Sequence, residues 1–430
     1  MRVGIFALAA DEEAGGGYTI ERDTVDALAQ ERSRTRHDLF LFSFLREEDA
    51  SGLPIYRIER PKPPAKALRA AWAWTRFRSM LHGNVESGPE WSREPTWRYE
   101  EVTRSGVDLV VCLSPRFFPT PDIPYFTIVW DLQHRLQPWF PEVSAGKEWI
   151  SRDRDYERVL VRASRVIVGT SVGKREVSSF YRVPRQSIRI LPLPTPTFAL
   201  EAGRPATAVA GEKHAGGRPY LFYPAQFWPH KDHVTALQAL RVLKERGLDV
   251  KLVFCGADKG NRGWVEAECS RLGLAGDVEF EGFVVRERLV ELYRGAFALV
   301  YPSWFGPDNL PPLEAFALGC PVVAARVAGS EEQLGDAALL FETGDEASLA
   351  SAVESLWSEP DLRRRLVRAG HDRALAFTPD HYAQGLLQII DEFERARGCW
   401  ERGPKYPNAH APVALSEDSE TSPEPLRSLR

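Results

Sequence analysis

The sequence predicts an α/β protein with two doubly wound parallel sheets, one in each half of the chain. Short apolar segments bounded by turn residues alternate with longer amphipathic segments, as expected when helices cover both faces of a parallel sheet. The 430 residues are enough for two domains that each bury a core. The alternation stops over residues 197–218, which are rich in Ala, Gly and Pro, and then starts again.

We therefore expect an N-terminal domain over residues 1–196, a linker over 197–218 and a second domain over 219–378. A terminal helix is predicted over 379–399, and the Pro/Ser/Glu-rich tail over 400–430 is expected to be disordered. The predicted strands span residues 3–8, 37–44, 107–113, 125–130, 166–169 and 188–191 in the first domain, and 220–224, 251–255, 278–281, 298–302, 322–325 and 338–341 in the second.

Composition argues against several classes of protein. The net charge of −5 disfavours nucleic acid as the main partner, and no apolar run approaches the roughly 18 residues of a membrane span. The five cysteines are scattered without Cys-x-x-Cys spacing, which fits a reducing cytoplasm and no zinc site. The apolar run over 3–10 is followed by Asp11, Glu12 and Glu13, so we interpret it as a first strand and not as a signal peptide.

A glycine-rich loop follows this first strand. Gly16 and Gly17 lie between the strand and an amphipathic helix that carries Ile20, Ala27 and Leu28 on its inner side. Glycines at such a point let the backbone approach a ligand closely. The spacing is not Gly-x-Gly-x-x-Gly, so a simple turn is about as good an interpretation.

A basic, tryptophan-bearing helix is predicted over residues 66–82. With Trp72 and Trp74 among its lysines and arginines, it could lie on an anionic membrane surface. The favoured alternative is a surface helix that packs its aromatic stripe on the N-terminal domain.

The predicted strand over 125–130 ends directly before Asp131-Leu132-Gln133-His134. Because ligands bind beyond the carboxyl ends of parallel strands, Asp131 is the candidate of this domain for a polar contact with a substrate hydroxyl. His134 could be reactive or could simply hydrogen-bond the loop.

Two loops of the second domain carry the main candidates. The first, QFWPHKDH over 226–233, contains Gln226 and Lys231. The second precedes a helix predicted to start at Leu310, where Pro311 and Pro312 are tolerated because first-turn N–H groups have no intrahelical partner.

The start of this second helix suits a phosphate. Unpaired amides and the partial positive charge of a helix N-terminus attract anions, and the amides near Asn309, Leu310 and Leu313 are the expected donors. Glu314 is placed to accept hydrogen bonds from sugar hydroxyls. A solvated carboxylate at Glu314 and a mere surface charge at Lys231 are the alternatives. Ser330 and Gln333 are predicted to form a capping box that opens the next helix.

The run PSWFGPDNLPPLEAFALGCPVVA resembles the carboxylate-bearing signature of retaining GT-B glycosyltransferases of family 4. That family carries two glutamates eight positions apart, and Glu314 matches the second, which binds the ribose of the nucleotide sugar. The first falls on Gly306, so the resemblance leaves Asp308 or backbone amides to contact the transferred sugar. The GP-D-N-LPPLEA and DLQH runs resemble those of a subgroup of bacterial polysaccharide transferases.

The resemblance assigns further roles. Lys231 matches a lysine that contacts the donor pyrophosphate, whereas Gln226 stands where most members have an arginine. Phe283 and Val284, after Gly282, resemble the turn that contacts the base, and the glycine-rich loop would face the cleft. The implied fold is GT-B, with two Rossmann-like domains that face a central cleft.

The resulting hypothesis is a metal-independent retaining glycosyltransferase. It would move a hexose from a nucleotide diphosphate sugar, GDP-mannose or a UDP-sugar, to a saccharide or lipid-linked acceptor in cell-surface polysaccharide synthesis. A nucleotide-sugar epimerase of the same fold and a non-catalytic nucleotide-sugar-binding scaffold are the alternatives. Gly306 and Gln226 favour the scaffold, and Lys231 and Glu314 oppose it.

Overall fold

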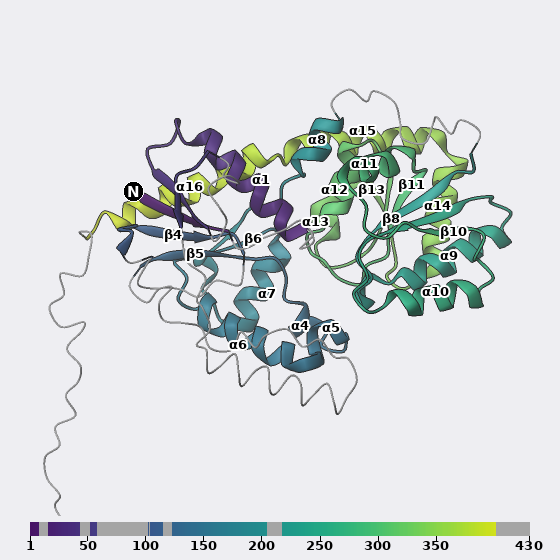
Figure 1. The fold of residues 1–430 in the computed structure, drawn as a ribbon, viewed down its shortest axis with the longest axis horizontal. Helices are drawn as coiled ribbons and strands as arrows, with labels where there is room; N and C mark the ends of the chain where they lie inside the picture. The colour runs from purple at the N-terminus through teal and green to yellow at the C-terminus, as the bar shows by residue number, and fades with distance from the viewer. Residues whose placement is uncertain are drawn as a thin grey trace, which may run out of the picture.

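A computed structural model describes residues 1–7, 16–43, 52–57, 102, 104–114, 123–203 and 217–400. Within these ranges the chain forms two α/β domains side by side, each built on one parallel sheet (Figure 1). The expectation of two doubly wound parallel-sheet domains in the GT-B arrangement is confirmed.

The first sheet has the strand order β3-β2-β1-β4-β5-β6-β7. Its neighbouring strands are parallel throughout. Its strands and helices are β1 (Arg2–Phe6), α1 (Gly16–Glu31), β2 (Asp38–Ser43), β3 (Ile55–Arg57), β4 (Leu109–Cys112), β5 (Tyr125–Val129), α4 (Gln133–Leu136), α5 (Pro141–Ser144), α6 (Glu148–Leu160), β6 (Arg165–Val168), α7 (Ser171–Tyr181) and β7 (Ile188–Ile190).

The second sheet has the order β10-β9-β8-β11-β12-β13, again parallel. Its strands and helices are β8 (Tyr220–Pro224), α9 (His233–Glu245), β9 (Lys251–Cys255), α10 (Arg262–Arg271), β10 (Val278–Phe280), α11 (Arg286–Gly295), β11 (Ala298–Tyr301), α12 (Leu310–Ala317), β12 (Val322–Ala325), α13 (Ser330–Leu334), β13 (Ala338–Phe341), α14 (Glu346–Ser358) and α15 (Pro360–Ala376).

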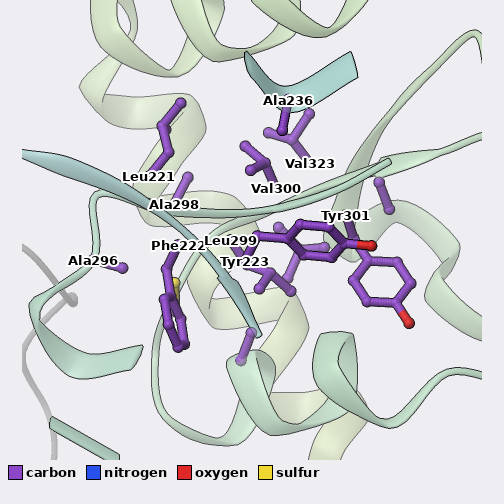
Figure 2. Packing of buried hydrophobic residues seen from close by; sticks show 14 of the residues in the cluster. Leu221, Phe222, Tyr223, Ala236, Ala296, Ala298, Leu299, Val300, Tyr301 and Val323 are labelled. Atoms are coloured by element: carbon purple, nitrogen blue, oxygen red, sulfur yellow. The ribbon is translucent and has the colours of Figure 1, made fainter. Parts of the chain in front are cut away.

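Buried β-branched, aliphatic and aromatic side chains hold the second sheet between its helices. Figure 2 shows part of this core, where Val300 and Val323, paired on neighbouring strands, lie on one side of the sheet and Phe222 lies on the other. Tyr223 and Tyr301 pack edge to face there, with ring centroids 5.5 Å apart, and their hydroxyls lie at the edge of the cluster. The core therefore fixes two tyrosines whose polar ends reach the loops beyond the strands.

The terminal helix α16 (Pro379–Arg397) crosses back to the first domain. It runs alongside α1 in Figure 1. Its inner face joins the core of the first sheet through Ala383, Leu386, Leu387, Ile389, Ile390 and Phe393. The two domains are therefore joined by packed structure as well as by the chain between them.

The linker expectation is wrong for its first part. Thr197–Gly203 forms the helix α8, and Ala199 and Leu200 are buried in the core of the second domain. A side chain at Gly203 would collide with the carbonyl of Ala317 in α12, so the Ala/Gly composition of this segment reflects close helix packing. Residues 204–216, the helix predicted over 66–82 and the tail after residue 400 lie outside the described residues.

Several short elements differ from the sequence prediction. The strand β3 and the short helices α4 and α5 were not predicted. No helix within the described residues is long and apolar enough to cross a membrane.

Candidate functional site

The loops that carry the main candidates follow two adjacent strands of the second sheet. Chain order reverses between β8 and β11, which places a topological switch point between them. The loop after β8 contains Lys231, and the loop after β11 contains Asn309. Ligands bind at such points, in the crevice outside the carboxyl ends of the strands.

A chain of hydrogen bonds joins these two loops. The ammonium of Lys231 donates to the hydroxyl of Tyr301 at 2.9 Å, and that hydroxyl donates to Oδ1 of Asn309 at 3.0 Å. The Lys231 Nζ also lies 5.3 Å from the centre of the Tyr301 ring. Lys231 is thus held next to the residue before α12, where an anion at the helix start would meet it.

The amide donors expected at α12 are fewer than the sequence suggested. The N–H of Asn309 donates to Oε1 of Gln333 at 3.0 Å, and Nε2 of Gln333 donates back to the Asn309 carbonyl at 2.8 Å. Leu313 is the fourth helical residue, where helix geometry directs its N–H to the same carbonyl. Of the three expected amides, that of Leu310 remains available to a ligand.

The capping-box prediction for Ser330 and Gln333 is also wrong. Gly329 is the N-cap of α13, and the Ser330 hydroxyl donates to the Val327 carbonyl at 2.8 Å. Gln333 is committed to Asn309, so it does not return to the start of its own helix. The pairing instead fixes the loop before α12 against α13.

The start of α1 faces the start of α12 across the cleft. A Cβ added at Gly16 would lie 3.2 Å from Cδ1 of Leu310, and one at Gly17 would lie 3.0 Å from the indole of Trp130. The ends of α1 and α12 meet in Figure 1. The N-termini of α1 and α12 thus lie close together, and the first-turn amides of each helix have no intrahelical acceptor.

Glu314 lies in α12 with only 9% of its surface exposed. Its Oε2 accepts a hydrogen bond from the Tyr293 hydroxyl at 2.6 Å, and Oε1 has no partner among the described residues. Burial raises the pKa of Glu314 to about 7, because the carboxylate is desolvated and Tyr293 offsets this only in part. One oxygen is thus free to accept a hydroxyl of a ligand.

Asp308 reaches across to the first domain. Its carboxyl group packs so closely on Gly169, at the end of β6, that a Cβ there would collide with it. Burial and the negative charge of Glu332 raise its pKa to about 7. We find no hydrogen bond to this carboxyl group from the described residues.

Gly306 cannot carry the side chain that the family signature would place there. Its φ is +131°, and a Cβ would collide with the amide of Asn309, whose Nδ2 donates to the Gly306 carbonyl at 2.8 Å. Gly306 therefore shapes the loop that presents Asp308 and Asn309.

Asp131 is placed at the cleft but is already paired. Its Oδ1 accepts from the Arg152 guanidinium and, at 3.0 Å, from the Gln133 amide. Although burial opposes ionisation, the charge of Arg152 and these hydrogen bonds hold its pKa below the ordinary value. Asp131 is thus an ionised, oriented acceptor.

His134 is a structural residue. It is fully buried, its Nε2 lies 2.9 Å from the Tyr181 hydroxyl, and burial lowers its pKa to about 4. The interpretation of His134 as a loop-stabilising residue therefore fits the geometry better than a reactive one.

The remaining candidates are Gln226, Phe283 and Val284. Gln226 accepts a hydrogen bond from the Trp228 indole at 2.9 Å, so its side-chain oxygen is already used. Phe283 is 60% exposed, as a ring that is to stack on a base would be, and Val284 packs on the core of the second domain. Gly282 before them has a φ of +70°, which makes the turn.

Sequence analysis missed Glu176. This carboxyl group lies in α7, and burial together with the charge of Asp131 raises its pKa to about 7. It stands in the second turn of a helix that begins right after β6, and that placement was the available signal.

Sequence analysis also missed the contacts between the domains. Oε1 of Glu142 in α5 accepts from the backbone N–H of His230 at 3.0 Å and lies 2.5 Å from its Nδ1. The carboxylate of Glu332 accepts from the amide and hydroxyl of Ser171. These pairs are distant in sequence, and no local pattern marks them.

One group of side chains in the described residues has metal-ligand spacing, namely His37, Asp391 and Glu394. It lies where α16 packs on the first domain, away from Lys231. The Arg36 guanidinium already bridges both carboxylates, and the N-terminal ammonium pairs with Glu394. Cationic groups of the protein thus occupy the positions a metal would take.

Comparisons with known proteins show similarity to glycosyltransferases. Residues 207–373 match the family model described as glycosyl transferases group 1. The chain is 28% identical over 284 residues to a D-inositol 3-phosphate glycosyltransferase of Nocardia farcinica, and the match covers 62% of each chain. The chain thus spans about three fifths of this curated relative.

Solved structures share the fold over a greater length. A glycosyltransferase from Rickettsia africae superposes with a TM-score of 0.64 at 14% identity, covering 92% of this chain and 99% of the other. Anabaena Alr3699/HepE in complex with UDP and glucose gives a TM-score of 0.63 at 14% identity, covering 91% and 100%. Residues 207–373 are therefore similar to the group 1 glycosyl transferases, and the two described domains have the GT-B fold.

Proposed function

We propose that this protein is a retaining glycosyltransferase that uses a nucleotide diphosphate sugar as donor. The observation that carries the proposal is the chain from Lys231 through Tyr301 to Asn309, at a point where the first turns of α1 and α12 converge. Such a site offers an ammonium and helix-end dipoles to one anion. A diphosphate leaving group has the charge and size that this set of donors suits.

The electrostatics favour bond breaking over simple binding. When the bond between sugar and phosphate breaks, negative charge accumulates on the departing diphosphate. Fixed donors at Lys231 and Leu310 stabilise that charge more in the transition state than in the ground state. Lys231 would exchange its hydrogen bond to Tyr301 for one to phosphate.

The carboxyl groups around this point would hold the sugars. The free Oε1 of Glu314 is suited to a ribose hydroxyl, and Phe283 and Val284 to the base. Asp308 replaces the carboxylate that is absent at Gly306 and would contact the transferred sugar. Asp131, oriented by Arg152, would accept a hydroxyl from that sugar or from the acceptor.

The closed arrangement supports transfer over hydrolysis. The Glu142–His230 and Glu332–Ser171 contacts join the two domains on either side of the cleft loops. Closure of this kind excludes water, which would otherwise attack the donor. Release of these contacts would let donor and product pass.

We further propose a hexose as the transferred sugar, GDP-mannose or a UDP-sugar as the donor, and a saccharide or lipid-linked acceptor of cell-surface polysaccharide synthesis. Support comes from the resemblance of the DLQH and GP-D-N-LPPLEA runs to polysaccharide transferases. Activity without a metal, a cytoplasmic location and peripheral contact with an anionic membrane through residues 66–82 belong to the same proposal.

The test is incubation with GDP- and UDP-sugars, without metal and with excess chelator. Slow release of free nucleoside diphosphate that needs Lys231 supports the transferase. Heat stabilisation by a nucleotide sugar with no turnover, with or without saccharide acceptors, would instead support the non-catalytic scaffold.

A further inference from the structure

A cavity lies beside the loop that carries Lys231. It has a volume of about 460 Å³, within the ~300–1,000 Å³ range of small-molecule sites. Trp139 and Phe140 line it from the first domain, and Trp264 and Trp304 from the second. None of the residues assigned to the donor lines it.

Its walls are unusually rich in exposed indoles. Trp139 is 66% exposed and Trp264 is 60% exposed, so large apolar faces meet water on both sides of the cavity. Trp304 is oriented by its own indole N–H, which donates to Asp232 at 2.7 Å. Flat indole faces pair well with a ligand that is itself flat and apolar on its faces.

The cavity also carries a polar group without a partner. The side chain of Asn261 makes no hydrogen bond with the described residues, so both its amide donor and its acceptor are available. Asp232, which also lines the cavity, adds a carboxylate to the wall.

We infer that this cavity binds a pyranose unit of a saccharide. A pyranose ring has C–H groups on its faces, which suit indoles, and hydroxyls on its edge, which suit the side chains of Asn261 and Asp232. Pro229 and Asp232, in its wall, flank His230 and Lys231. On the proposed function, the bound unit belongs to the acceptor and lies beyond the residue that receives the sugar.

A lipid chain fits the same cavity less well. An alkyl chain would cover the Asn261 amide without offering it a hydrogen bond, and a polar group buried without a partner costs roughly 1–3 kcal/mol. A saccharide hydroxyl would pair with this amide. The chemistry therefore favours a sugar over an acyl tail.

The experiment measures saccharide binding by calorimetry, without nucleotide, on the full chain. The probes are hexasaccharides of glucose, mannose and galactose, with decanoate as the apolar-chain probe. Trp264→Ala should weaken the binding of at least one hexasaccharide by roughly tenfold, the value of one aromatic contact. Trp264→Phe, which keeps a ring, should recover most of the loss.

Trp357→Ala is the matched control, because this tryptophan is 38% exposed but packs on Phe297, outside the cavity. It should leave saccharide affinity unchanged. No saturable binding of any hexasaccharide, equal binding by Trp264→Ala and wild type, or binding of decanoate alone would overturn the inference.

A parallel titration with GDP and UDP separates this inference from the proposed function. Trp264→Ala should bind both nucleotides as wild type does. Saccharide binding that depends on Trp264, in a protein that binds neither nucleotide, would sustain the cavity and overturn the donor site.

Discussion

Asp131 in the first wall of the cleft and Glu314 and Asp308 in the second are held in opposite ways. Asp131 is paired with Arg152, and its pKa is lowered. Glu314 and Asp308 have no ion-pair partner among the described residues, and burial raises the pKa of each to about 7. Glu176 in the first domain, whose pKa burial also raises to about 7, resembles the second group. Asp131 is therefore preset, whereas Glu314 and Asp308 are left for a ligand to complete.

This difference suits the roles proposed for the two walls in binding substrate. A paired carboxylate keeps its position and charge whether or not substrate is present. An unpaired, desolvated carboxyl group is costly in the free protein, and that cost is relieved when ligand hydroxyls bind. The second wall is therefore the one expected to respond to a nucleotide sugar.

The largest expected effect is that of Lys231→Ala, which removes the mobile charge of the second wall. Turnover should fall by ~10²–10³, as for loss of one transition-state donor, while nucleotide affinity changes less. Initial-rate kinetics with the active donor give this comparison. Lys174→Ala, on α7, is a control, and an equal loss in both variants would contradict the assignment.

The next effect concerns Glu314 and pH. Its pKa rises from the ordinary 4.5 to about 7 on folding, so the folded state holds more protons between these values. Stability contributed by the protonated form should be present at pH 4.5 and lost as pH rises through 7, by up to ~3 kcal/mol. Glu314→Gln should abolish this loss.

Denaturant titrations of wild type and Glu314→Gln at pH 5 and pH 8 measure that difference. A nucleotide sugar should restore part of the stability that wild type loses between pH 5 and pH 8. Parallel pH curves for both proteins would show that Glu314 is not the titrating group.

A smaller effect is expected from the preset wall. Arg152→Met leaves Asp131 without its counter-charge and should lower the free energy of unfolding by about 2 kcal/mol, less than for a fully buried pair because both side chains are partly exposed. The double variant Arg152→Met, Asp131→Asn should recover most of this. Calorimetric melting of wild type, both single variants and the double variant measures this double-mutant cycle. If the losses in free energy of unfolding of the two single variants simply add, the pairing is excluded.

The smallest effect is expected from a variant that disturbs the contact between the two walls. Gly169→Ala places a methyl group where the Asp308 carboxyl group packs, so it should hinder closure and cost about 1 kcal/mol. The expected readout is a modest fall in turnover with a rise in donor hydrolysis. Gly276→Ala, at an exposed glycine with open space around it, should not alter the ratio of hydrolysis to transfer.

Periodicity predicted most of the fold, because buried strands and amphipathic helices follow local rules. The strands 220–224, 251–255, 322–325 and 338–341 have the predicted bounds. The linker prediction was wrong over 197–203, where Ala and Gly serve close packing on α12. Composition alone does not separate a flexible segment from a tightly packed helix.

The candidate site was less predictable, because its geometry depends on contacts between distant segments. Ser330 and Gln333 have the spacing of a capping box, yet Gln333 pairs with the loop before α12. Arg152 lies far along the chain from the cleft strands, so its pairing with Asp131 was not visible. Glu176 gains its raised pKa from burial that only the folded chain shows.

The most direct measurement is a crystal structure with bound GDP or UDP. The account predicts the diphosphate within hydrogen-bonding distance of the Lys231 ammonium and the Leu310 amide, facing the first turn of α1, with the ribose on Glu314. A nucleotide bound elsewhere, with Lys231 still on Tyr301 and those amides facing solvent, would contradict it.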